Sequence, residues 1–123
     1  VRIPSDSGPS AKLEMTFDGI WVGPNNVTLI KQLDGYIVLQ GKDSMSTWWA
    51  RGVINGDTIT CRGSGVTNNG DQFVYESTME LKDDDVLEDS WKAIFVEGKT
   101  LQGDDALKKV KVQVLDKTDR TAQ

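Results

Sequence analysis

The sequence predicts an all-β protein, an antiparallel up-and-down barrel of about eight strands. Turn-forming residue pairs recur at short intervals along the chain. The segments between them are rich in Val, Ile, Thr and aromatic residues, and apolar residues alternate with polar ones. Up to residue 98, no segment has the apolar period of a helix. Short alternating strands joined by tight turns are typical of a meander that closes on itself.

Four residue pairs ending in glycine mark expected turns, because glycine adopts the positive φ that tight hairpins need. They are Asp34-Gly35, Asn55-Gly56, Asn69-Gly70 and Glu97-Gly98. We expect strands at 17–23, 26–33, 36–42, 47–54, 57–66, 72–82, 86–96 and 108–115. The stretch Gly103–Lys109 is predicted to hold one helical turn, with Asp104 and Asp105 capping its start.

The length and composition fit one domain with one hydrophobic core. The chain has 123 residues, of which 37% are hydrophobic and 27% charged, an ordinary balance for a folded domain. We expect the barrel domain to span residues 16–116. Residues 1–15 are predicted to be a flexible leader, because their first ten are rich in Pro, Gly and Ser, and residues 117–123 a flexible tail.

Charge and rare residues exclude several classes of function. The net charge of −5 gives no broad basic surface, so no nucleic-acid partner is expected. The absence of histidine excludes a Ser-His-Asp triad, and the single cysteine, Cys61, excludes an intramolecular disulfide and an ordinary zinc site. No apolar run approaches the roughly 20 residues of a membrane helix. We expect no catalytic motif, metal site or cofactor, and the compartment stays open, with secretion and the periplasm as options.

The hairpin around Asn55-Gly56 predicts which residues face inward. A two-residue loop pairs residue 54 with residue 57 and fixes the register. The inward pairs are then Trp48 with Gly63, Ala50 with Cys61 and Gly52 with Ile59, and the outward pairs are Trp49 with Arg62 and Arg51 with Thr60. In the next hairpin, Phe73 faces Gly65 and Tyr75 faces Gly63, and the inward set is Phe73, Tyr75, Ser77, Met79 and Leu81.

The inward positions combine large aromatic residues with glycine, alanine and serine. A barrel of about eight strands has an interior that is either just filled by side chains or holds one small ligand. Both alternatives stay open on the pattern alone. For a ligand, Trp48, Phe73, Tyr75 and Trp91 are expected to supply contact area, and Ser77 a polar group.

Three segments resemble the calycin group of lipocalin-like and avidin-like barrels. They are Gly19-Ile20-Trp21 in the first strand, the meander with Asp34-Gly35 after the second strand, and the stretch from Ser90-Trp91-Lys92-Ala93 to Lys109-Val110-Lys111-Val112. The resemblance implies the barrel over roughly residues 17–114, with Trp21 packed across one end. Gly23 and Val27 stand where avidin-like proteins have the Asn and Ser that bind biotin. The resemblance therefore implies the fold without biotin as ligand.

Adjacent strand residues point to opposite faces, so one indole of Trp48-Trp49 lies outside. We expect Trp49 on the outer face, in cation–π contact with Arg62 and near Arg51. A one-residue slip at a bulge would exchange the two tryptophans. Such a Trp–Arg contact is often only a surface pair. Because tryptophan and arginine are frequent interface anchors, the alternative is that Trp49, Arg51 and Arg62 form a surface for another protein or a second copy of the chain.

The remaining candidate groups have structural interpretations. Asp83, Asp84 and Asp85, with Glu88 and Asp89, are predicted to form a solvated acidic loop, because their spacing fits no EF-hand. Cys61 on the inward face is expected to behave as a small hydrophobic residue.

Three functions follow, in order of preference. The first is a non-catalytic barrel that binds a small, largely apolar ligand in its interior. The second is a solid-core module for protein interaction or self-assembly through an outer strand face. The third is an enzyme acting inside the barrel through carboxylates or a polar network, which requires a buried Asp or Glu with a raised pKa in a cleft.

Overall fold

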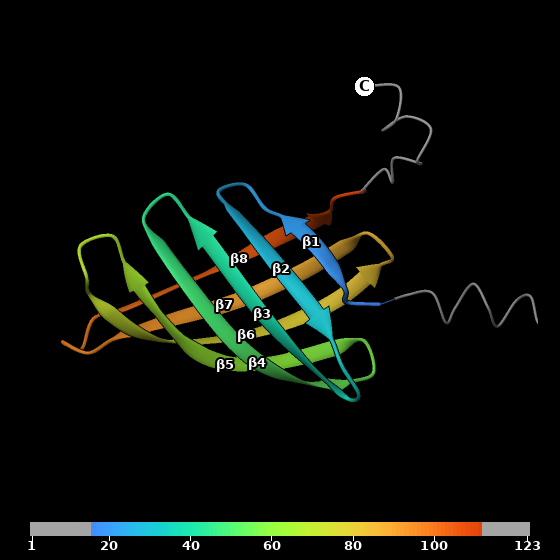
Figure 1. Ribbon diagram of the computed structural model, residues 1–123, viewed down its shortest axis with the longest axis horizontal. Coiled ribbons are helices and arrows are strands. Elements are labelled where there is room, and N and C mark those ends of the chain that lie inside the picture. The colour runs from blue at the N-terminus through green and yellow to red at the C-terminus, as the bar shows by residue number, and fades with distance from the viewer. Residues whose placement is uncertain (1–15, 112–123) are drawn as a thin grey trace, which may run out of the picture.

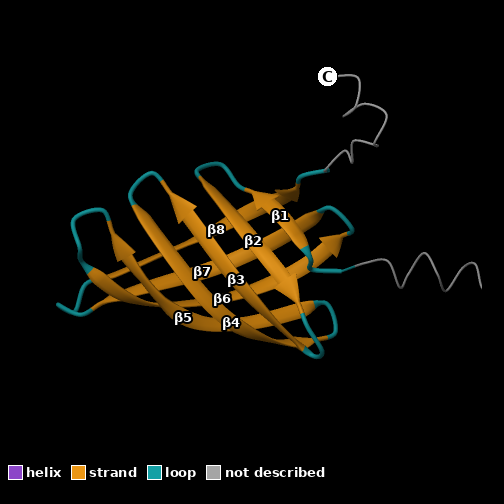
Figure 2. Cartoon of the chain, viewed as in Figure 1, coloured by secondary structure: helices purple, strands orange, loops and turns teal. Residues whose placement is uncertain are grey.

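The computed structural model describes residues 16–111, which form eight strands and no helix (Figures 1 and 2). The strands are β1 Gly19–Val22, β2 Asn26–Gln32, β3 Tyr36–Asp43, β4 Ser46–Asn55, β5 Thr58–Thr67, β6 Gln72–Asp83, β7 Val86–Phe95 and β8 Thr100–Lys109. Each pairs antiparallel with the next, and β1 pairs with β8 to close the barrel. The predicted fold class is confirmed. The predicted leader (1–15) and tail (117–123) lie outside the described residues.

The strands at the front of the barrel cross those at its back. Figure 1 shows β2 and β3 in front of β7 and β8, with the two sets of strands running in crossed directions. The four predicted glycine turns join strands, and Gly35, Gly56, Gly70 and Gly98 all have positive φ. Within residues 16–111, no helix is long and apolar enough to cross a membrane.

The β4–β5 register differs from the predicted one, although the inward face is the same. Asn55 pairs with Thr58, so the loop residues are Gly56 and Asp57 rather than Asn55 and Gly56. Gly56 therefore takes the first central position of the turn with a φ of 63°, a position that a type II′ turn favours for glycine.

The shift changes the partner of each β4 residue without exchanging the two faces. Trp48 lies opposite Gly65, Ala50 opposite Gly63 and Gly52 opposite Cys61. Outside, Trp49 lies opposite Ser64, and Arg51 lies opposite Arg62. All five predicted pairs, three inward and two outward, are therefore wrong. The β5–β6 register and the inward set of β6 are confirmed.

The last strand begins earlier than predicted. β8 spans Thr100–Lys109, so the helical turn predicted at 103–109 is wrong, as is a start of this strand at residue 108. The sequence Gly103-Asp104-Asp105 has low β propensity, but nine residue pairs with β7 hold it in the sheet. Cross-strand pairing outweighs local propensity here.

One end of the interior is aliphatic and closed. Residues near the β2–β3, β4–β5 and β6–β7 turns are fully buried, among them Ile37, Ile59 and Leu87. Trp21 has 0% exposure, and its Nε1 donates a hydrogen bond to the carbonyl oxygen of Phe17 at 3.0 Å. The packing role that the resemblance implies for Trp21 agrees with this burial.

Aromatic rings cover three of the inward glycines. The Trp48 indole lies over Gly41, and the Phe73 ring lies over Gly65. A Cβ atom at Gly103 would lie 2.9 Å from the Trp91 indole. Each ring comes from a residue directly opposite its glycine. The glycines therefore make room for large neighbouring rings, an arrangement known to pin strand register.

Candidate functional site

The five predicted ligand-contact residues all belong to the inner face of the barrel. Trp48 of β4 and Tyr75 of β6 stack with ring centroids 5.8 Å apart. Ser77 lies directly opposite Trp91 on β7. Phe73 packs instead against Phe95, with centroids 5.1 Å apart, near the β5–β6 and β7–β8 turns. The structure thus groups Trp48, Tyr75, Ser77 and Trp91 around β6 and places Phe73 near the start of that strand.

Two inward carboxylates, Asp89 and Asp105, were not among the predicted site residues. Asp89 is only 7% exposed and lies between Leu87 and Trp91 on the inner side of β7. Its predicted place in a solvated acidic loop is therefore wrong. The alternation from Leu87 through Trp91 to Ala93 already marked position 89 as inward. By contrast, Asp83, Asp84 and Asp85 do lie at the β6–β7 turn, largely exposed.

Asp89 and Asp105 lie directly opposite each other on neighbouring strands. Asn26 Nδ2 donates a hydrogen bond to Asp105 Oδ2 at 3.2 Å, which brings the start of β2 against the middle of β8. Burial first, and then the negative charges of Asp105 and Asp104, raise the pKa of Asp89 to about 7. The Ser77 hydroxyl lies close enough to oppose this rise.

Four buried polar atoms of this region have no hydrogen-bond partner among the described residues. They are Asn26 Oδ1, Trp48 Nε1, Ser77 Oγ and Asp89 Oδ1. The Ser77 hydroxyl, although near Asp89, thus completes no hydrogen bond with it. Buried polar groups in folded proteins are almost always paired, and each unpaired one costs about 1–3 kcal/mol. Four of them around one inner surface require an explanation. We name this set, together with Tyr75, Trp91 and Asp105, the inner polar cluster.

Two neighbouring groups keep their protons at ordinary pH. Burial raises the pKa of the Cys61 thiol to about 11, so this cysteine is a poor nucleophile, in agreement with its predicted inert role. Burial and the Asp89 charge also raise the pKa of Tyr75 well above its usual range. Near neutral pH, Asp89 is therefore the group of this trio whose charge varies.

The seam between β1 and β8 is short. These strands share two residue pairs, Trp21 with Lys109 and Val22 with Lys108, so β8 before residue 108 pairs only with β7 in the described structure. Asp105 lies in this stretch and is partly exposed. The inner polar cluster is therefore close to a gap in the strand pairing.

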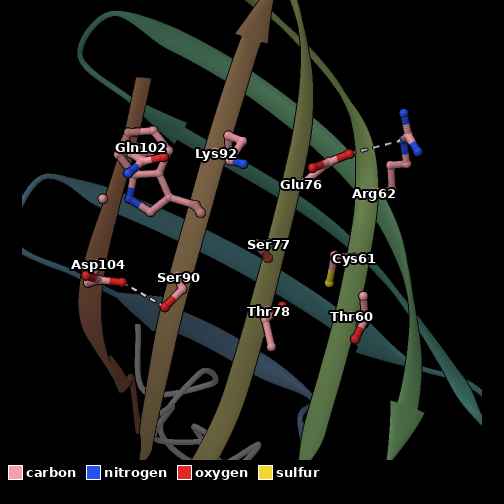
Figure 3. A pocket seen from close by; sticks show the side chains of 12 residues that line it. Thr60, Cys61, Arg62, Glu76, Ser77, Thr78, Ser90, Lys92, Gln102 and Asp104 are labelled. Atoms are coloured by element: carbon pink, nitrogen blue, oxygen red, sulfur yellow. Dashed lines mark hydrogen bonds and ion pairs between the residues drawn. The ribbon is translucent and has the colours of Figure 1, made fainter. Parts of the chain in front are cut away.

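A hollow of about 730 Å³ lies over β5–β8 (Figure 3), lined mainly by outward side chains of these strands and also by Cys61, Ser77 and Trp91. Four of its polar side chains form two pairs. Arg62 Nε lies 3.7 Å from Glu76 Oε2, and Ser90 Oγ donates a hydrogen bond of 2.7 Å to Asp104 Oδ1. Both contacts appear as dashed lines in Figure 3. These four groups are satisfied within the hollow and call for no ligand.

The predicted interaction residues all face outward but do not form one contact. Trp49 is 49% exposed. The Arg51 guanidinium lies 5.0 Å from the centroid of the Tyr36 ring, whereas Arg62 pairs with Glu76. Leu29 and Val38, on the adjacent β2 and β3, are exposed on this same outer face.

Comparison of the chain with models of known protein families and with curated proteins found no match. The inference of function therefore depends on the geometry of the barrel interior.

Proposed function

We propose that the protein is a non-catalytic barrel that binds one small, largely apolar molecule with a polar end in its interior. The observation that supports this function best is the set of four buried, unpaired polar atoms in the inner polar cluster. A bound molecule would complete their hydrogen bonds and remove the cost of leaving them unpaired. The indoles of Trp48 and Trp91 and the Tyr75 ring would cover its apolar part. The resemblance to calycin barrels is in keeping with this function.

Tryptophan fluorescence during titration with fatty acids, retinoids, sugars, biotin and aromatic metabolites tests the proposal. Adjacent residues on opposite faces supply a matched pair of variants, Trp48→Phe and Trp49→Phe. We expect a saturable signal. Its midpoint should move to at least about tenfold higher ligand concentration in Trp48→Phe but not in Trp49→Phe, because only the first of these two tryptophans faces the interior. No saturable binding, or equal losses in both variants, would count against an interior site.

A second candidate function is self-assembly through the outer face of β2–β4. Its support is the exposure of four apolar side chains there, Leu29, Val38, Trp49 and Val53, since such groups mark interfaces when they lie together. Light scattering over a range of concentrations separates the two functions. A mass that stays monomeric contradicts self-assembly, and an oligomer that Trp49→Ser dissociates supports it.

Asp89 meets part of the condition for the third candidate, a carboxylate enzyme, because it is buried and its pKa is raised. A buried carboxyl with a pKa of about 7 suits general acid–base catalysis at neutral pH. Binding ranks first because the unpaired atoms need a partner before any reaction begins. Mass analysis of a bound ligand after prolonged incubation distinguishes the two, since only an enzyme would return a changed molecule.

A further inference from the structure

We infer that the polar end of the ligand is an organic cation with N–H donors, such as an ammonium or amidinium group, held at Asp89. This inference rests on the proposed binding function and specifies the chemistry of its site. It follows from the charges, the unpaired atoms and the aromatic faces around Asp89.

The interior carries negative charge with no cation paired to it. Asp89 and Asp105 face each other across β7 and β8, and like charges directly opposite on a sheet are destabilising. The ion pairs of residues 16–111 involve neither of them. Lys109, also on the inner side, lies 5.3 Å from the Trp21 ring and donates to the carbonyl of Thr16. A ligand cation would supply the missing positive charge.

The unpaired atoms are mostly acceptors. Asp89 Oδ1 and Asn26 Oδ1 accept hydrogen bonds, and Ser77 Oγ accepts as well as donates. The orientation of the Asn26 amide follows from its Nδ2, which donates to the Asp105 carboxylate. Ser77 is 4% exposed and Asp89 is 7% exposed, so both acceptors are removed from bulk solvent. A head group with several N–H donors matches this set.

The aromatic residues favour a cation over a neutral donor. Trp48 and Tyr75 stack at 5.8 Å, and Trp91 is the next inward residue after Asp89 on β7. Electron-rich ring faces attract a cation that has left water. Trp48 Nε1 is a buried donor without a partner, so the ligand should also carry one acceptor atom along its apolar part.

Binding of a cation should release a proton near neutral pH. The groups facing Asp89 on the inner side are Asp105 on β8, Tyr75 and Ser77 on β6, and Cys61 on β5, whereas the charge of Asp104 acts from the outer face of β8. A cation binds the ionised form of Asp89, whereas burial and the two β8 carboxylates hold its pKa at about 7. As the pH rises towards 7, the affinity for the cation should increase by up to about tenfold per pH unit, and above pH 7 it should level off.

Three probes of one shape and different charge test the inference by calorimetry on the whole chain. They are phenylbutylamine, phenylbutanol and phenylbutanoate, measured between about pH 5.5 and 8.5, where the amine stays charged. We expect the amine to bind about 10- to 100-fold more tightly than the alcohol, as a charged hydrogen bond provides. The carboxylate should bind most weakly, and only the amine should gain affinity as the pH rises.

Asp89→Asn should abolish both the preference for the amine over the alcohol and the pH dependence of amine binding. Glu88→Gln is the matched control, since Glu88 precedes Asp89 and is exposed on the outer face; it should keep the amine affinity within about twofold. Circular dichroism checks that each variant is folded. The comparison of the three probes on the wild-type protein tests the inference even if a variant fails to fold.

If the alcohol binds as tightly as the amine or more tightly, and this binding is lost in Trp48→Phe, the inference of a cationic ligand is wrong but the proposed binding function is supported. A preference for the amine that survives in Asp89→Asn would overturn the assignment of Asp89. If none of the three probes binds while the wider panel yields a Trp48-dependent ligand, the cation is likewise overturned. Absence of any interior ligand would overturn both proposals.

Discussion

The interior of the barrel has two regions of opposite character. Around the β2–β3, β4–β5 and β6–β7 turns, residues such as Ile59, Met79 and Leu87 are fully buried and carry no charge. In the middle of β6, β7 and β8 lie a serine and two carboxylates, Ser77, Asp89 and Asp105, with unpaired buried atoms nearby. Both regions belong to the same strands, two or four residues apart.

The two regions should have different roles, the aliphatic end in stability and the inner polar cluster in binding. The aliphatic end gains free energy by removing apolar surface from water. The inner polar cluster loses free energy in the unliganded protein, because its polar atoms and a carboxyl group are buried without full compensation. A site that is costly when empty gains most from a ligand that completes it, so the same residues that weaken the fold should strengthen binding.

The largest effect is expected at the aliphatic end. Leu87→Ala removes a fully buried side chain and should lower the free energy of unfolding by about 2–5 kcal/mol, since the core cannot close the cavity completely. Urea denaturation measures this change. Val53→Ala, on the outer face with 66% exposure, is the control and should change stability by about 0.5 kcal/mol or less. Equal losses would mean that this end is not the stabilising core.

The next largest effect concerns Asp89, whose replacement should raise the free energy of unfolding, whereas Leu87→Ala lowers it. Its pKa is raised from 3.8 to about 7 in the folded state, so between these values the folded protein holds a proton that the unfolded chain has lost. Stability therefore falls as pH rises towards 7 and levels off above it. Between about pH 5 and 8 the loss should reach roughly 2–3 kcal/mol.

Asp89→Asn removes this titration and should be more stable than the wild type at pH 8, with the difference shrinking towards pH 5. Urea denaturation at both pH values measures it. Glu88→Gln, which changes an exposed carboxylate on the outer face, should leave the pH slope unaltered. A wild-type protein whose stability rises steadily over this range would contradict a buried, protonated Asp89.

The sequence indicated the fold more fully than the site, for reasons visible in particular residues. Alternation and glycine turns predicted the strands and the inner face of β6, because a side-chain period of two survives a register shift of two residues. The position of β8 was missed because Gly103, Asp104 and Asp105 have low β propensity and depend on β7 for their strand conformation.

Asp89 was missed for a different reason. Its neighbourhood of acidic residues suggested a solvated loop, although alternation placed it inward. Neither the Asp105 contact nor the Asn26 hydrogen bond is visible from the chain order, since Asn26 and Asp105 are 79 residues apart. The burial of Asp89 without a hydrogen-bond partner is a property of the folded barrel. It can be recognised only when β8 is correctly placed beside β7.

An intermediate effect is expected where a ring of the cluster lies over a glycine. In Gly41→Ala the new Cβ would overlap the Trp48 indole, so the indole must move away from residue 41 and disturb its stacking with Tyr75, at a cost of about 1–3 kcal/mol. Urea denaturation and the tryptophan emission spectrum report the change. Trp48→Phe combined with Gly41→Ala should recover part of the loss, because a smaller ring leaves room for the methyl group. Additive losses would show that the two residues are not in contact.

The smallest effect is expected in the outer hollow, where four polar side chains form two exposed pairs. The Arg62 and Glu76 side chains are 74% and 38% exposed, and their closest charged atoms are 3.7 Å apart. Arg62→Ala should therefore lower stability by less than about 1 kcal/mol, and by less still at high salt, because water screens exposed pairs. Arg62→Ala should also leave the affinity for an interior ligand unchanged, whereas Asp89→Asn should weaken the binding of the amine. A larger effect of Arg62→Ala than of Asp89→Asn on ligand affinity would move the binding site from the inner to the outer face of the same strands.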